Sequence, residues 1–306
     1  MNWILLCIVV AFLYSIVAFF DNYITDVIFR GDRPQAIKVF NGAFYSSVAI
    51  FIALVFGIES LPVKIAILAL VSGAIHSLAS IPYYLALRNE ESTTAAIYFQ
   101  LIPILCFFAD IFILGRTITT QQIIAFVVIL LAPVVILFAQ KTRSKKANKK
   151  KHQSDLLLIA YVVIASASTV LFSHISDNHY DSWSLFFWYL LGRFTFDTCA
   201  TILMPSWRKY VKRILKRKPL KTLAIIYGSG IIYIIGDFIF RYALSLTNSS
   251  FASVVTNASE LILTFILGII LTLIWPKFGR EKLDKRNIGA HFVAIVFVII
   301  SIILIQ

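Results

Sequence analysis

Long apolar stretches dominate the pattern of this chain. Seven of them contain no Asp, Glu, Lys or Arg and are long enough to cross a bilayer core of about 30 Å. These are residues 3–20, 39–58, 65–87, 92–109, 117–140, 156–176 and 287–306. Three more stretches, residues 181–204, 222–245 and 248–275, are long enough only if the charged residues inside them are tolerated. The pattern predicts an all-α integral membrane protein with ten transmembrane helices.

The composition supports this prediction. Of 306 residues, 59% are hydrophobic and 14% are charged, and the mean hydropathy is +0.87. A soluble domain needs more polar surface than this. The first stretch lacks a basic start and a small-residue cleavage site, so we expect a permanent span rather than a signal peptide. Cys7, Cys106 and Cys199 stand alone in apolar stretches and are expected to be small core residues, not a disulfide or metal site.

The basic residues gather in a few loops. Residues 141–151, 205–221 and 275–286 together hold 20 of the 28 Lys and Arg residues. Loops that follow even-numbered helices hold only Lys64 and Arg116. The positive-inside rule therefore predicts that the basic loops are cytoplasmic and that both termini are outside. We interpret the net charge of +13 as a topology signal and as contact with anionic lipid headgroups, not as a nucleic-acid site.

A weak internal repeat relates the two parts of the chain. A shift of 157 residues aligns residues 84–103 with 242–260, so that Gln100 meets Asn257. Repeats of this kind are common in transporters and constrain where the binding site lies.

The simplest organisation is a five-helix repeat over residues 1–140, a basic cytoplasmic linker at 141–154, and a second five-helix repeat over 155–306. Because five is odd, the two repeats must be inverted relative to one another. Inverted repeats are the arrangement that supports alternating access.

Several short motifs resemble the EamA-type repeats of the drug/metabolite transporter superfamily. A degenerate "AL…S…A…P" pattern occurs once in each repeat, at the junction of its third and fourth helices. Pro103 keeps the proline of this family's fourth helix, whereas the second repeat has Glu260 there. In the turn that follows, Arg116 replaces the usual Glu of the first repeat, while the second repeat retains Glu281. The resemblance implies ten helices in two inverted repeats around a central cavity, with the fifth and tenth helices at the periphery.

Charged residues inside the spans are the main candidates for function. Arg193 and Asp197 are four apart on one predicted helix, and Asp237 and Arg241 are four apart on the next, so each pair shares a helix face and is expected to form an intrahelical ion pair. Such residues avoid lipid. They either bind a solute or fix the packing of the helices by neutralising one another.

Glu260 has no opposite charge within a turn on its own helix. It needs a partner on another helix, water or a proton. Burial favours the neutral form of a carboxyl group and a nearby Arg favours the charged form, so a group balanced between them could bind and release a proton. The alternative is a fixed brace from Glu260 to Arg193 or Arg241.

Two amides, one histidine and three aspartates near helix ends are weaker candidates for function. Gln100 and Asn257 lie near the middle of their helices, where they either offer amide hydrogen bonds to a solute or bond to a neighbouring helix. His76 lies among small residues and either lines the cavity or packs against backbone. Asp21, Asp26 and Asp110 lie near helix ends, where we expect solvated side chains; the alternative is a gate to the cavity.

No HExxH, GxSxG, P-loop or dinucleotide-binding motif is present, so we expect neither an enzyme nor a cofactor. We predict a secondary active transporter that moves a small polar, amino-acid-like or otherwise amphoteric solute, coupled to protons or working by exchange. The short loops favour a bacterial plasma membrane. The expected substrate-binding residues are Arg193, Arg241, Gln100, Asn257 and His76, and the expected proton- or ion-coupling residues are Glu260 and Asp237. The alternative is a non-transporting membrane scaffold or an accessory subunit of a lipid flippase.

Overall fold

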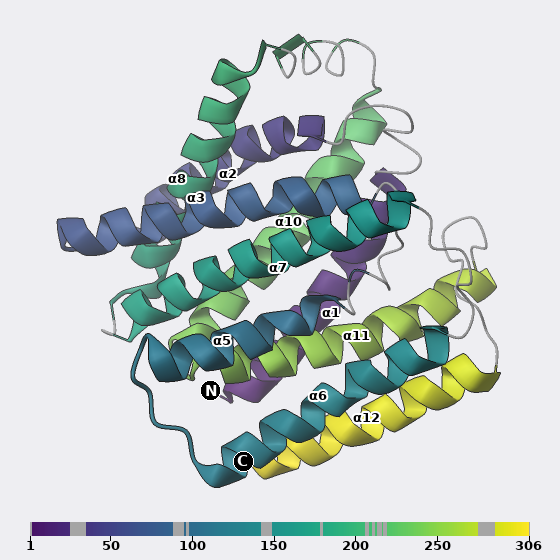
Figure 1. Ribbon diagram of the computed structural model, residues 1–306. Helices are drawn as coiled ribbons and strands as arrows, with labels where there is room; N and C mark the ends of the chain where they lie inside the picture. Colours follow the sequence, from purple (N-terminus) through teal and green to yellow (C-terminus); the bar gives the residue numbers. More distant parts are fainter. Residues whose placement is uncertain are drawn as a thin grey trace.

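The protein is a bundle of long helices (Figure 1). This computed structural model describes residues 2–24, 35–87, 95, 98–141, 149–177, 180–205, 208–209, 212, 216, 219–274 and 285–305. Within them the helices are α1 (Trp3–Tyr23), α2 (Gln35–Phe56), α3 (Val63–Ala86), α5 (Leu101–Phe112), α6 (Thr120–Lys141), α7 (Lys149–Ser176), α8 (Ser182–Leu203), α10 (Leu220–Leu244), α11 (Ser249–Ile274) and α12 (Lys285–Ile305). The prediction of an all-α membrane fold with ten helices is confirmed.

Five of these helices, within the described ranges, are long and apolar enough by themselves to cross a membrane: α1, α3, α7, α10 and α11. Helices α2, α5, α6 and α12 contain shorter apolar segments. The predicted span at 92–109 falls partly outside the described residues, and α5 continues beyond its expected end to Phe112.

Local signals define several helix ends. The Asn2 side chain accepts a hydrogen bond from the backbone amide of Ile4 at the start of α1 (3.0 Å), and Asp181 accepts from the amide of Ser184 at the start of α8 (2.7 Å). Both satisfy amides that the first helical turn leaves without a partner. Gly57 (φ +72°) follows α2 and Gly115 (φ +64°) follows α5. These left-handed conformations end the two helices at little cost because glycine has no Cβ atom.

Successive helices alternate in direction, so the bundle has two ends (Figure 1). We call the end where α6 ends and α7 begins the linker end, and the end where α1 begins and α12 ends the terminal end. Helices from the two parts of the chain pack in pairs: α2 with α8, α5 with α11, and α6 with α12. Helix α1 packs on α10 and α11, while α3 and α5 pack on α7. We call α1, α2, α3, α5 and α6 the first group of helices and α7, α8, α10, α11 and α12 the second group. The core lies between these two groups.

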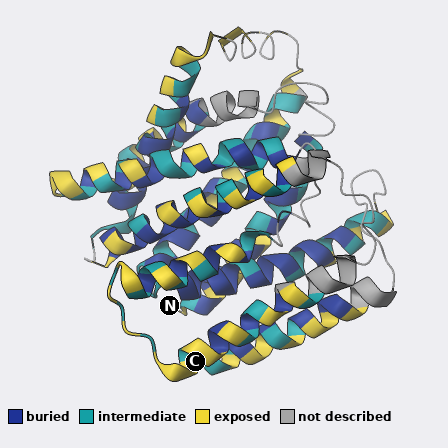
Figure 2. Cartoon of the chain, viewed as in Figure 1, coloured by how far each residue is buried: buried dark blue, intermediate teal, exposed yellow. Residues whose placement is uncertain are grey.

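Exposed residues lie on the outer faces of the bundle and buried residues between the helices (Figure 2). Many of the exposed side chains are large and apolar; on α12 they include Phe292, Val296, Ile299 and Ile303. Apolar surface of this extent suits contact with lipid chains rather than with water.

Helices α3 and α8 cross at two glycines. A Cβ atom at Gly73 would lie 1.9 Å from the carbonyl oxygen of Tyr189, and one at Gly192 would lie 1.9 Å from the carbonyl oxygen of Leu70. Small residues let membrane helices approach this closely. The crossing brings α8, which carries Arg193, against α3, which carries His76.

Candidate functional site

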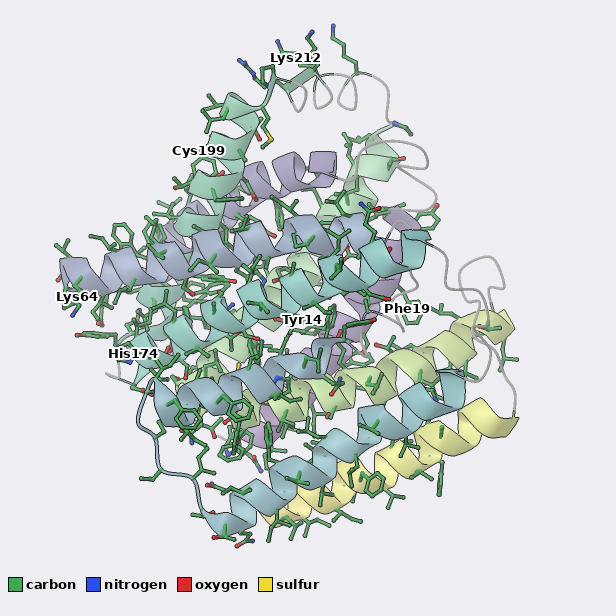
Figure 3. All side chains as sticks on the ribbon, in the orientation of Figure 1. Tyr14, Phe19, Lys64, His174, Cys199 and Lys212 are labelled. Atoms are coloured by element: carbon green, nitrogen blue, oxygen red, sulfur yellow. The ribbon has the colours of Figure 1, made fainter. Side chains whose placement is uncertain are left out.

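A cavity of about 110 Å³ lies between α1, α3, α5, α7, α10 and α11. Its ionisable lining comprises Asp21, His76, Asp237, Glu260 and the tyrosines Tyr14, Tyr83, Tyr161 and Tyr233. The side chain of Tyr14 projects into the middle of the bundle (Figure 3). Sequence positions from both parts of the chain thus meet at one polar site inside an apolar bundle.

A second cavity of about 70 Å³ adjoins the first. The two share Asp21, His76, Tyr83, Tyr161 and Tyr233 among their lining residues. The second cavity adds residues from the linker-end parts of α1, α3 and α10, and it adds Arg193 from α8. Together the two cavities extend from the middle of the bundle toward the linker end.

Arg193, Asp237 and Arg241 form a buried charge cluster. Arg193 Nη1 lies 2.9 Å from Asp237 Oδ2, and Arg241 Nε lies 3.3 Å from Asp237 Oδ1. All three side chains are at most 3% exposed. The expected pair of Asp237 with Arg241 on one helix is confirmed.

The other expected intrahelical pair was wrong in its partner. Where the chain is described, Arg193 of α8 pairs with Asp237 of α10, whereas Asp197 accepts a hydrogen bond from Ser77 Oγ of α3 (2.8 Å). Residues four apart face the same side of a helix, but the packing of α10 against that face supplies a second carboxylate, and the guanidinium group reaches it.

Tyrosine and histidine side chains surround this cluster. Arg193 donates to Tyr45 Oη (2.6 Å) and to Tyr233 Oη (3.2 Å), and Arg241 donates to Tyr189 Oη (3.0 Å). The guanidinium of Arg193 lies 4.0 Å from the ring centre of Tyr45, and that of Arg241 lies 4.4 Å from the ring centre of Tyr189. These hydrogen bonds and cation–π contacts replace the water that buried arginines lose.

His76 joins the cluster to the cavity. Its Nε2 lies 2.8 Å from Tyr233 Oη and its Nδ1 lies 3.2 Å from Arg241 Nη2. The sequence left open whether His76 lines the cavity or packs against backbone. The structure places it on the cavity wall, with its ring nitrogens bonded to side chains.

Glu260 is 6% exposed and lines the larger cavity. Among the ion pairs of the described residues, none involves its carboxylate, and both candidate partners pair with Asp237 instead. The alternative of a fixed brace from Glu260 to Arg193 or Arg241 is therefore not the arrangement in this structure. Glu260 thus lines the cavity without an ion pair to any described residue.

Gln100 and Asn257 bond the two parts of the chain together. Gln100 Nε2 donates to the carbonyl oxygen of Asn257, and Asn257 Nδ2 donates to the carbonyl oxygen of Phe99, each at 2.8 Å. Both amides thus make the helix-to-helix bonds that were the alternative to solute binding. Asn257 also lines the cavity.

The expectation of solvated side chains was wrong for Asp21 and Asp110, which are both buried, and Asp21 lies at the cavity as in the alternative. Asp21 is 7% exposed, lines both cavities and lies 3.2 Å from Tyr83 Oη and 3.4 Å from Tyr84 Oη. Asp110 is fully buried and pairs with Arg116 at 2.7 Å. Their positions near helix ends misled the sequence interpretation, because neighbouring helices cover both ends. Asp26 lies outside the described residues.

Comparisons with known proteins agree with this architecture. Residues 1–138 match the model of the EamA-like transporter family. A crystal structure of a protein at 15% sequence identity matches with a TM-score of 0.66, covering 99% of this chain and 95% of that chain. At that identity the likeness shows the fold alone. No curated protein matches the sequence.

Proteins of this family are transporters rather than enzymes. The resemblance seen in the short motifs is thus confirmed over residues 1–138, and the match extends to the basic linker. The first part of the chain is thus similar to the EamA-like transporter family, and the apolar helices of the described residues fit an all-α integral membrane protein of that type.

Proposed function

We propose that the protein is a secondary carrier that moves a small amphoteric solute through the two joined cavities by alternating access. The observation that carries the proposal is the Glu260 carboxylate, which faces the larger cavity without an ion pair among the described residues. A charged group in such a position is costly, so it is expected to serve a solute, water or a proton.

The chemistry of the lining supports an amphoteric solute. Glu260 and Asp21 offer carboxylates beside the aromatic rings of Tyr83, Phe99 and Tyr161, a combination that suits an ammonium group. Arg193 lines the second cavity, and its buried Nε has no hydrogen-bond partner in the described part of the chain. We assign this donor to an anionic group of the same solute.

The remaining candidates take supporting roles in the proposal. Asp237 balances the charges of Arg193 and Arg241, and we assign it to holding them rather than to proton coupling. Arg241 and His76 hold the wall of the cavity through Tyr189 and Tyr233. Gln100 and Asn257 keep α5 and α11 in register.

Alternating access is supported by the pairing of helices. Equivalent helices of the two five-helix groups pack on each other, as in α2 with α8 and α5 with α11. We propose that residues 1–140 and 155–306 are two inverted repeats that rock about the cavity. Two coupling modes fit this design: proton coupling through Glu260, or exchange of one solute for another.

The test begins with a thermal-shift screen of small amphoteric metabolites, since a ligand that binds only the native protein raises its apparent stability. Flux of the solute that binds is then measured in proteoliposomes across a pH series for Glu260→Gln. We expect the pH dependence of flux to be lost or altered while the variant stays folded. Asp21→Asn is measured in parallel because Asp21 is another carboxylate that lines both cavities.

Glu59→Gln is the matched control, because Glu59 is exposed and lies outside both cavities. Unchanged flux and unchanged pH dependence in Glu260→Gln would remove Glu260 from the proposal. If no solute binds and none is transported, the result favours the alternative of a non-transporting membrane scaffold.

A further inference from the structure

At the terminal end of the bundle, Arg116 ties the two groups of helices together. It lies in the turn after α5, and its Nη2 donates to the Asp177 carboxylate (2.6 Å) and to Ser173 Oγ (3.0 Å) on and just beyond α7. Its Nη1 donates to Asp110 Oδ1 of α5 (2.7 Å). One guanidinium group therefore joins a helix of the first group to a helix of the second.

Asp110 extends the connection to a third helix. Its Oδ1 accepts from Ser249 Oγ and its Oδ2 from the backbone amide of Ser250, each at 2.8 Å. These bonds cap the N-terminus of α11, where a carboxylate is favourable. We call Asp110, Arg116, Ser173, Asp177 and Ser249 the Arg116 clamp.

The clamp lies just beyond the cavity on the same three helices. The cavity wall includes Ile102 of α5, Thr169 of α7 and Ser253 of α11. Thr169 is one turn from Ser173, and Ser253 is one turn from Ser249. The clamp therefore joins α5, α7 and α11 between the cavity and the terminal end.

Another part of the terminal end is closed by aromatic stacking. The ring of Trp183 stacks between Phe56 and Phe238, with ring centres 4.0 Å apart on each side. These rings belong to the end of α2, the start of α8 and the end portion of α10. The two cavities, in contrast, extend toward the linker end.

The clamp also differs chemically from the aromatic stack. Arg116 is 12% exposed and Asp177 is 49% exposed, so the bond between the two groups of helices is open to water. Water can take over the hydrogen bonds of this pair when it separates, at a small net cost. The pair of Arg116 with Asp110 and the cap of α11 are buried and would stay intact.

We propose that the Arg116 clamp is the latch of a gate that closes the cavity at the terminal end. The ion pair between Arg116 and Asp177 breaks when the protein changes to the conformation in which the cavity is open to solvent at that end. The proposal rests on the alternating access proposed above. The latch works because one exposed ion pair couples α7 to α5 and α11, and these three helices carry a large part of the cavity wall.

Accessibility of the cavity tests the latch without a known solute. Thr169→Cys places a thiol on the cavity wall, in a background with Cys199→Ser. A membrane-impermeant maleimide is applied to each side of sealed membranes, and labelling at the engineered thiol is read by peptide mass spectrometry. A tag before α1 identifies the terminal-end side, because α1 begins at that end.

The latch variants are Asp177→Asn and Arg116→Ala. Asp177→Asn is the milder one, since it leaves Asp110 paired and α11 capped. We expect labelling from the terminal-end side to rise about two- to fivefold, because the loss of one water-exposed ion pair shifts a two-state equilibrium only modestly. Labelling from the linker-end side should fall.

Lys64→Ala is the matched control, because Lys64 is an exposed basic residue at the same end and makes none of the clamp contacts. Figure 3 shows Lys64 and His174, at the start of α3 and near the end of α7, on the same side of the molecule. Labelling in this variant should match the parent.

Unchanged labelling in a folded Asp177→Asn variant would overturn the latch. So would an equal rise from both sides, which indicates loosening of the whole bundle. A one-sided rise in a protein that transports no solute would retain the latch and refute the carrier. Normal solute flux together with unchanged labelling of the cavity thiol would retain the carrier and refute the latch.

Discussion

The buried cluster around Asp237 shows how a charged residue is tolerated inside an apolar bundle. Two arginines share one carboxylate, and other guanidinium donors reach the hydroxyl groups of Tyr45, Tyr189 and Tyr233. Arg193 Nε and Arg241 Nη1 have no hydrogen-bond partner in the described part of the chain. Removing one partner from such a cluster leaves charge buried without compensation, which costs more than the cluster contributes in net stability.

Asp237→Asn is therefore expected to destabilise the protein by about 3–5 kcal/mol, because Arg193 and Arg241 lose their shared carboxylate. The measurement is the thermal unfolding midpoint in detergent. Glu59→Gln removes an exposed carboxylate and should leave the midpoint unchanged. A midpoint equal to that of the parent in Asp237→Asn would mean that the arginines find other compensation.

Among the helices, the crossing of α3 and α8 determines where the cluster forms. Gly73 and Gly192 allow backbone contact between the helices, which brings Ser77 to Asp197 and positions Arg193 near the cavity wall. A side chain at either glycine would have to displace backbone rather than a flexible side chain.

Gly73→Ala and Gly192→Ala should each prevent normal folding or lower the unfolding midpoint sharply, since the added Cβ atom would lie 1.9 Å from a carbonyl oxygen. Size-exclusion profiles and unfolding midpoints report the effect. Gly228→Ala in α10 is the matched control, because a Cβ atom there meets no atom within 4 Å. Wild-type behaviour of both crossing variants would show that α3 and α8 can separate freely.

At the scale of the whole molecule, the two ends of the bundle differ. Basic loops follow the helices that finish at the linker end, whereas Lys64 and Arg116 are the basic residues of the connections at the terminal end. The cavities extend toward the first end, and the Arg116 clamp joins helices at the second.

The charge bias predicts that the terminal end faces away from the cytoplasm. A reporter that fluoresces only in the cytoplasm should therefore stay dark when fused after α12 and be bright when inserted in the basic linker 141–154. Bright fluorescence after α12 together with a dark linker insertion would reverse the orientation.

The sequence alone determined the features that depend on the solvent around each segment. Long apolar stretches specify helices in a bilayer wherever they occur, so the number and approximate bounds of the helices could be predicted. The short motifs of the EamA type and the charged residues in α8, α10 and α11 could be identified for the same local reason.

Only the tertiary structure decided which of those residues meet. Arg193 lies 44 positions from its carboxylate partner, and Arg116 lies 61 positions from Asp177. Asp21 and Asp110 near helix ends become buried because other helices cover them. Packing of distant helices selects these partners, and helical periodicity contains no information about the neighbour. Glu260 therefore faces the cavity while both arginines are held by Asp237.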